Sequence, residues 1–221
     1  MTAPSQSPPP LSTAANAANA AASPRVAALV LAAGRSTRFG SDKRQARLPD
    51  GRTLLEAVLQ TQRQACDGVL ALLRPDDHWG RSLCADMGVS SLVVPDAGEG
   101  MGRTLASGLR ALLALPDVEA VLPGDRFDAA MVVLADMPFV QVDTVRALID
   151  AFRHRGRPAC PWHGGRPGHP RLLPRDRWAS LLDLSGDEGA RHRLDWSKAC
   201  RVDVPDGGVL IDVDTPTDLG G

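Results

Sequence analysis

The sequence predicts an α/β protein with a Rossmann-like, three-layer α/β/α arrangement around a mostly parallel central sheet. Apolar runs as short as buried strands alternate along the chain with segments of helical periodicity. The two clearest runs, residues 26–33 and 130–135, are followed directly by Gly34 and by Asp136. Because open α/β sheets bind ligands at the carboxyl ends of their strands, the same pattern also predicts where a site lies.

The composition indicates one domain that follows a disordered tail. Residues 1–24 are mainly Pro, Ser, Ala and Asn, without the basic start and apolar centre of a signal peptide. Residues 25–221 suffice for one domain with a sizeable core. The net charge of -1 creates no strong field of one sign, and no apolar stretch has the length of a membrane span. We therefore expect neither nucleic acid nor a membrane as a partner.

Four cysteines are scattered along the chain without a C-x-x-C pair: Cys66, Cys84, Cys160 and Cys200. This spacing fits neither a zinc site nor a dense disulfide framework. We expect free thiols in a reducing compartment, and hence a cytoplasmic protein.

The first strand, over residues 26–33, leads into a polar loop that suits a triphosphate. Between Gly34 and Lys43 the loop offers backbone amides, the guanidiniums of Arg35 and Arg38 and a lysine ammonium. Gly34 and Gly40 enclose five residues and Lys43 does not directly follow Gly40, so the loop does not match the Walker pattern or the dinucleotide-binding pattern. An ordinary strand–turn with surface basic residues is the alternative.

A helix and two strands follow the loop. Thr53 and Glu56 have the spacing of a capping box, and the apolar positions after them predict a helix over about 54–65. Strands are expected at residues 69–73 and 92–94, with a short helix between them that ends near residue 87.

Three glycines within five residues, at 98–102, then precede another helix. Free amides at such a helix start suit an anion or the edge of a base, although a solvent-exposed loop is an equal alternative. Arg103 lies in the first turn, where a cation needs an acidic partner. We interpret residues 116–129 as a surface excursion that contributes no catalytic or binding residues.

Asp136 follows the apolar run 130–135 within the sequence Asp-Met-Pro. A carboxylate at the end of a central parallel strand, together with substrate phosphates, is a typical Mg²⁺ ligand. A helix cap is the rival explanation. Pro138 weakens it, and Asp143 is the better cap for the helix expected to end at about residue 155.

The segment 153–177 is strongly basic, with seven arginines, three histidines and one acid. Its prolines and glycines predict little regular structure. Such a loop suggests a second anionic ligand, with a solvated surface loop as the alternative. A metal site at His163 and His169 is disfavoured because no Cys or carboxylate lies at a suitable spacing.

The last part of the chain predicts a turn that leads into a short helix at 185–194. The segment 209–216 predicts a late strand that ends in two acids, Asp212 and Asp214. On a strand these two side chains share one face, so both could point at the same site. A soluble acidic tail is the alternative. A final turn of helix is expected from residue 217.

Five sequence blocks in this order resemble the nucleotidyltransferases that act on molybdopterin. The resemblance covers about residues 26–219. The opening block L-A-[AG]-G-x-S-x-R-[MF]-G-x-x-K appears at 31–43 and G-M-G-x-[ST]-L-x-x-G at 100–108. The other three blocks are Asp136-Met137-Pro138 after a strand, a G-x-P-G-H-P pattern at 165–170 with G-D-x-G-A-R at 186–191, and D-[IV]-D-T-P at 212–216.

The resemblance implies roles for individual residues. Catalysis would involve Arg38, Lys43 and Asp136. The nucleotide would be bound by Leu31, Ala32, Ala33, Gly34, Arg38, Lys43, Gly102 and Thr104. Mg²⁺ would be held by Asp136 with an acid of the final segment, most simply Asp214, with Asp212 left open. The acceptor would contact Arg166, His169 and Arg191.

The resemblance implies transfer of CMP from CTP to a molybdopterin-type cofactor with release of pyrophosphate. Ala33 resembles the cytidylyltransferase branch, whereas the guanylyltransferase branch, which uses GTP, usually has glycine there. Transfer to a different phosphorylated acceptor stays open, as does a non-catalytic protein that delivers cofactor to a client molybdoenzyme. One departure from the family pattern stands out: residues 44–47, Arg-Gln-Ala-Arg, are more basic than the usual leucines.

Overall fold

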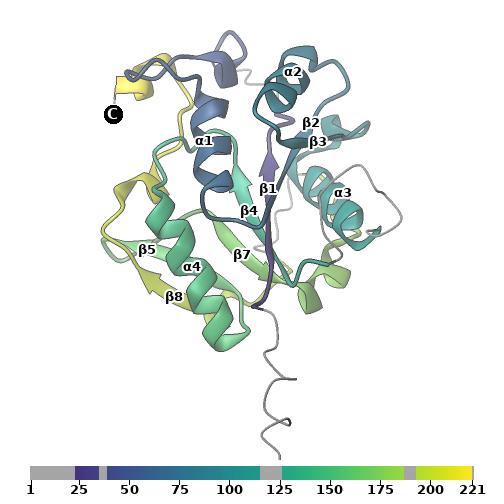
Figure 1. Cartoon of the computed structure of the whole chain (residues 1–221), viewed down its shortest axis with the longest axis vertical. Helices are drawn as coiled ribbons and strands as arrows, with labels where there is room; N and C mark the ends of the chain where they lie inside the picture. Colours follow the sequence, from purple (N-terminus) through teal and green to yellow (C-terminus); the bar gives the residue numbers. More distant parts are fainter. Residues whose placement is uncertain (1–22, 35–38, 115–125, 187–192, 221) are drawn as a thin grey trace, which may run out of the picture.

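A computed structural model describes residues 23–34, 39–114, 126–186 and 193–220. An eight-stranded sheet lies between two helical layers (Figure 1), which confirms the expected fold class. In chain order the helices and strands are β1 (Val26–Leu31), α1 (Leu54–Arg63), β2 (Gly68–Leu73), α2 (His78–Asp86), β3 (Ser90–Val93), α3 (Met101–Ala114), β4 (Ala129–Leu134), α4 (Val142–Arg155), β5 (Ala159–His163), β6 (Arg166–Pro167), β7 (Arg171–Pro174) and β8 (Cys200–Asp203).

The sheet is parallel in its centre and mixed at one side. Its strand order is β3-β2-β1-β4-β7-β5-β6, and β8 pairs with β5. Strands β1 to β4 pair in parallel, whereas β7 is antiparallel to both β4 and β5. Leu31 at the end of β1 is paired with Leu134 at the end of β4. The carboxyl ends of the two central strands therefore meet at one edge.

Alternate residues of the central strands supply two separate cores. Val26, Ala28 and Val30 of β1 face α1 and α4, and Ala27 and Leu29 face α3. Burial on both faces explains why β1 and β4 are continuous apolar runs without polar alternation. The expected capping box at the start of α1 is present, with the Glu56 amide donating to Thr53 Oγ1 at 3.3 Å.

The expectation of little regular structure between residues 153 and 177 is wrong. Strands β5, β6 and β7 lie there, and a 3-10 helix over Arg175–Leu181 follows them. Ala159, Leu172 and Leu173 are completely buried by these elements. The apolar side chains buried there stabilise these short strands although the prolines supply no backbone donors.

The strand expected in the segment 209–216 is also wrong. A 3-10 helix spans Gly207–Leu210, and another spans Pro216–Gly220 where a helical turn was expected. The buried Asp206 carboxylate accepts a hydrogen bond from the Gly208 amide at 2.9 Å. This Asp-Gly-Gly turn chemistry prevails over the short apolar run that follows it.

Asp143 is not the cap of α4. The helix begins at Val142 with Gln141 at the cap position, and no cap side chain accepts a hydrogen bond there. Asp206 instead accepts hydrogen bonds from the Gln141 amide at 2.8 Å and from Thr144 Oγ1 at 2.7 Å. A carboxylate far along the chain thus replaces the expected local cap.

Several expectations fall on residues outside the described ranges: most of the tail, Arg38, the 116–125 part of the surface excursion, and Arg191. All four cysteines are free thiols, as expected, and burial raises the pKa of Cys66 to about 12. Across the described ranges, no helix combines the length and the apolar character that crossing a membrane requires.

Candidate active site

The candidate site lies over the carboxyl ends of β1 and β4. The Ala135 amide donates to the Leu31 carbonyl at 3.4 Å, which holds the two strand ends together before Asp136 leaves the sheet. A cavity of about 340 Å³ opens above them. It is lined by Leu31, Ala33, Gly34, Ala97, Gly98, Gly100, Met101, Thr104, Leu134 and Asp136. This is the edge at which an open α/β sheet binds its ligand.

The side chain of Lys43 joins two acids at this edge. Its Nζ atom lies 3.0 Å from Asp136 Oδ2 and 2.9 Å from Asp214 Oδ1. Burial alone would lower the pKa of Lys43, but the hydrogen bonds and negative charges of Asp214 and Asp136 outweigh it and raise the pKa. The lysine therefore stays charged and can neutralise phosphate oxygens.

Asp214 reaches the site through backbone contacts, not through a strand. The buried Val213 donates its amide proton to the Asp136 carbonyl at 2.8 Å. The Asp218 carboxylate then accepts hydrogen bonds from the amides of Asp214, at 3.1 Å, and Thr215, at 2.7 Å. Those backbone hydrogen bonds lower the pKa of Asp218. Asp212 is exposed, so the turn selects Asp214 from the acid pair.

The two carboxylates fit a divalent metal ion. Asp136 Oδ1 is buried and has no hydrogen-bond partner, which leaves a lone pair aimed away from solvent. The described residues contain no cluster of three or more His, Cys, Asp or Glu side chains able to hold a metal. Mg²⁺ is commonly bound by one or two carboxylates plus substrate phosphates and water, and this donor set has that character.

The start of α3 forms another wall of the cavity. Thr104 lines it, as expected for a nucleotide contact, and its Oγ1 donates to the Gly100 carbonyl at 3.4 Å. The Gly102 amide is already used, because it donates to the Gly186 carbonyl at 2.9 Å. Arg103 has the acidic partner it needs, with a guanidinium nitrogen 3.0 Å from Asp96.

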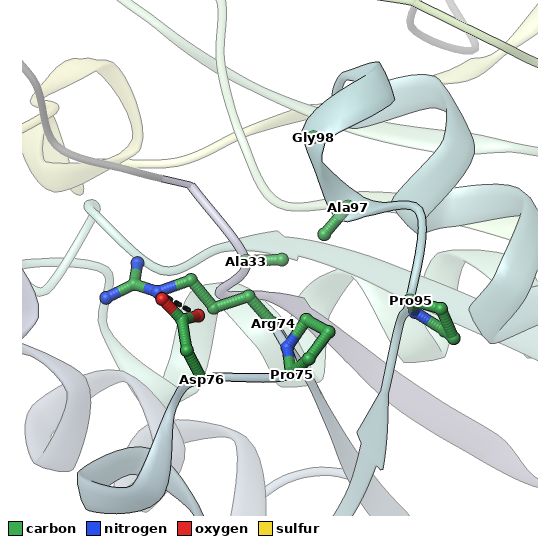
Figure 2. A pocket seen from close by; sticks show the side chains of 7 residues that line it. All are labelled: Ala33, Arg74, Pro75, Asp76, Pro95, Ala97 and Gly98. Carbon is green, nitrogen blue, oxygen red and sulfur yellow. Dashed lines mark ion pairs between the residues drawn. The ribbon is translucent and has the colours of Figure 1, made fainter.

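A second cavity of about 300 Å³ adjoins the first (Figure 2). The two cavities share Ala33, Ala97 and Gly98. The second is further lined by Arg74, Pro75, Asp76 and Pro95, and Arg74 Nε lies 3.1 Å from Asp76 Oδ1. The Ala33 side chain points toward Ala97 across it. The two cavities are therefore neighbours with a shared wall.

Comparison with known proteins agrees with this geometry. Residues 28–201 match the family described as the MobA-like NTP transferase domain. The chain belongs to this family. The family resemblance and the expected enzyme class, a nucleotidyltransferase, are confirmed by this match.

Relatives of the chain carry names of the same chemistry. A "Probable molybdenum cofactor guanylyltransferase" of Mycobacterium avium (strain 104) is 31% identical over 88% of this chain and 93% of its own length. The "Molybdenum cofactor cytidylyltransferase" of Escherichia coli (strain K12) is 23% identical over 86% of this chain and 92% of its own length.

A solved structure extends the comparison to the fold. The crystal structure of Rv0371c from Mycobacterium tuberculosis H37Rv has a TM-score of 0.70 at 30% identity and covers 88% of this chain and 95% of its own. The same protein has also been crystallised in complex with manganese.

The three expected acceptor residues of this family member lie on separate segments. Arg166 is exposed on β6, His169 precedes β7, and Arg191 is outside the described residues. Burial, assisted by the positive charge of Arg171, lowers the pKa of His169 to about 4. His169 is therefore neutral near pH 7, and its buried Nδ1 lacks a hydrogen-bond partner. Their common role at an acceptor remains a prediction.

Sequence reasoning missed a group of charged residues beside the loop between Gly34 and Lys43, which we call the nucleotide loop. The guanidinium of Arg44, only 3% exposed, contacts both Asp42 and Asp77. Arg74 donates to the Gly34 carbonyl at 2.8 Å and lies 3.3 Å from Asp42. The one signal in the sequence was that position 44 departs from the family pattern. This departure marks Arg44 as unusual, but it does not identify Asp42 and Asp77 as its partners.

Proposed function

We propose that this chain catalyses the metal-dependent transfer of a nucleoside monophosphate from a nucleoside triphosphate to a molybdopterin-type cofactor, with release of pyrophosphate. The observation that carries the proposal is that Lys43 lies between Asp214 and Asp136, the acid that lines the strand-end cavity. A protein that only carried a pterin would need neither a triphosphate-binding lysine nor a pair of acids for a metal ion.

The chemistry needs charge neutralisation and alignment more than a protein nucleophile. The acceptor phosphate that attacks and the pyrophosphate that leaves are both anionic, and the two repel each other at the α-phosphorus. Lys43 would bind the triphosphate, while Asp136 and Asp214 would hold the divalent metal. When bound, the metal supplies positive charge to the phosphate oxygens. The rigid strand ends would keep the reacting groups in line.

We propose CTP as the nucleotide. The cavity shown in Figure 2 would take the base, and Ala33 lines both cavities where a glycine would leave more room. An added methyl group favours a pyrimidine over the larger guanine. GTP is the second candidate, because the M. avium relative is named a guanylyltransferase.

The test is a panel of four nucleoside triphosphates and several phosphorylated acceptors, read by pyrophosphate release with Mg²⁺, Mn²⁺ or EDTA. We expect turnover with CTP and a molybdopterin-type acceptor, and none with EDTA. Preference for GTP would make the chain a guanylyltransferase, and turnover on a sugar phosphate would change the acceptor. Tight pterin binding without turnover on any nucleotide would indicate a delivery protein for a client molybdoenzyme.

The matched variant for this panel is Asp136→Ala. Loss of the Asp136 carboxylate should abolish pyrophosphate release. The fold should stay intact, because this side chain lies at the end of β4 and not within the core. Circular dichroism and thermal unfolding would verify the fold. Turnover at the wild-type rate by this variant would contradict the metal assignment.

A further inference from the structure

Arg44 forms the centre of a buried ionic network that we call the loop anchor: Asp42, Arg44, Arg74 and Asp77. Arg44 Nε lies 2.8 Å from Asp42 Oδ1, and its terminal nitrogen lies 2.5 Å from Asp42 Oδ2. Its other terminal nitrogen donates to the Asp77 carboxylate and, at 2.6 Å, to the Ala32 carbonyl. A planar guanidinium can make this set of contacts and a lysine ammonium cannot.

The loop anchor joins three segments that are separate in the chain. Ala32 and Gly34 follow β1, and their carbonyl oxygens accept hydrogen bonds from Arg44 and Arg74. Asp77, only 3% exposed, caps α2 by accepting the Gly80 amide at 2.8 Å. Both the beginning and the end of the nucleotide loop are therefore tied to the segment after β2.

Lys43 lies between two residues of the anchor, Asp42 and Arg44, so the anchor can determine where the Lys43 side chain lies. Asp42 caps a 3-10 helix over Lys43–Gln45 and accepts the Arg44 amide at 3.2 Å. Because Asp42 and Arg44, on either side of Lys43, are held by the anchor, the Lys43 side chain points to Asp136 and Asp214. No residue of the anchor contacts those two acids, so the network acts through Lys43 and the loop backbone.

We propose that Arg44 is a positioning residue that holds Lys43 and the two described ends of the nucleotide loop, residues 32–34 and 39–46, in place before the nucleotide arrives. This inference rests on the proposed function for its effect on turnover. Every cation of the network has a carboxylate partner, and Arg74 also lies 3.1 Å from Asp76, so the network holds the loop ends through directed ion pairs and hydrogen bonds. Ordering the loop in advance reduces the entropy lost when the nucleotide binds.

The test compares Arg44→Met with the double variant Arg44→Met/Asp77→Asn. The single variant leaves Asp77 buried without its cation, which endangers folding. The double variant removes one positive and one negative charge, so the net charge of the network is unchanged, and asparagine can still cap α2. A matched control is Leu148→Ala, which opens a cavity in the core at α4 and lowers stability without touching the loop.

For the double variant we expect the KM for the nucleotide to rise about tenfold or more while the KM for the acceptor changes less than about twofold. Amide hydrogen exchange in residues 39–46 should become about tenfold faster without nucleotide, and exchange in α4 should not change. Leu148→Ala should lower the melting temperature and leave both the nucleotide KM and the exchange of residues 39–46 at wild-type values.

An unchanged nucleotide KM in the folded double variant, or an equal rise in Leu148→Ala, would overturn the positioning role. The exchange measurement needs no activity, so it judges the anchor separately from the reaction. If the wild type binds no nucleotide by calorimetry, the proposed function fails. Faster exchange in the double variant would then still show that Arg44 holds the loop, and unchanged exchange would reject both ideas.

Discussion

The Val213 amide donates a hydrogen bond of 2.8 Å to the Asp136 carbonyl, and this contact brings Asp214 to the same lysine that Asp136 binds. One acid thus comes from the end of a central strand, and the other comes from a turn docked against it. The site depends on the backbone path of residues 206–218 as much as on the carboxylates themselves.

Asp214→Asn should reduce turnover by on the order of 10²-fold or more, because an amide cannot replace a negative metal ligand or pair with Lys43. The neighbouring variant Asp212→Asn is the control, since Asp212 is exposed. Steady-state rates at several Mg²⁺ concentrations would measure both. Equal losses in the two variants would show that the turn does not select Asp214.

Lys43→Met should bind Mn²⁺ more tightly than the wild type when no nucleotide is present. The ammonium of Lys43 lies within 3.0 Å of both acids and competes with a metal cation for them. The same variant should bind the nucleotide about tenfold or more weakly, because the triphosphate loses a cation. Calorimetric titrations with Mn²⁺ alone and with nucleotide would separate the two effects, and weaker binding in both would contradict the competition.

Gly208→Ala should displace the segment that carries Asp214. A Cβ atom at position 208 would lie 2.2 Å from the Phe139 carbonyl oxygen, so the backbone must move. We expect a loss of about 1–3 kcal/mol in unfolding free energy together with weaker metal binding. Gly207→Ala is the matched control, because a Cβ there meets only His163 Nε2 at 3.7 Å. A metal affinity that falls equally in both variants would refute this explanation.

His169 should make the protein less stable as the pH falls from about 6.5 to about 4. Burial lowers its pKa from 6.5 to about 4, so the unfolded chain takes up the proton first in this range. The loss should reach about 2–3 kcal/mol below pH 4, after allowance for the partial exposure of the ring.

Urea unfolding of the wild type and of His169→Asn across this pH range would measure the effect. The variant should have a shallower pH dependence, because it has no group to protonate at that position. His154→Asn, on the exposed end of α4, should keep the wild-type dependence. Identical pH profiles for the wild type and His169→Asn would show that the imidazole is not held neutral.

The elements that the sequence predicts well are those with a local cause. The capping box at Thr53 and the doubly buried runs of β1 and β4 need no distant partner to be recognised. Strands β5 and β7 were missed because their prolines signal a loop locally, and only the burial of residues such as Leu172 shows the opposite. The end of the chain was misread because Asp206 acts on Gly208 and on α4 together.

The site was predictable to the extent that strand ends and acids mark it. The place of Asp136 after β4 and the family pattern at Asp214 indicated two acids that the structure does bring to one lysine, although the face-sharing argument for Asp214 was wrong. Their role as metal ligands stays a prediction. The loop anchor was not predictable, since nothing in the sequence pairs Arg44 with Asp77 across 33 positions. Long-range ion pairs leave no periodic signal.

The contact between Lys43 and Asp214 joins residues 171 positions apart in the chain. A contact of such long sequence separation costs loop-closure entropy and requires both parts of the chain to be present. A chain that is still being synthesised, or that has folded only as far as β4, therefore has the Asp136 carboxylate at the site but lacks that of Asp214. Manganese affinity measured during refolding would accordingly report that the end of the chain has docked against β4.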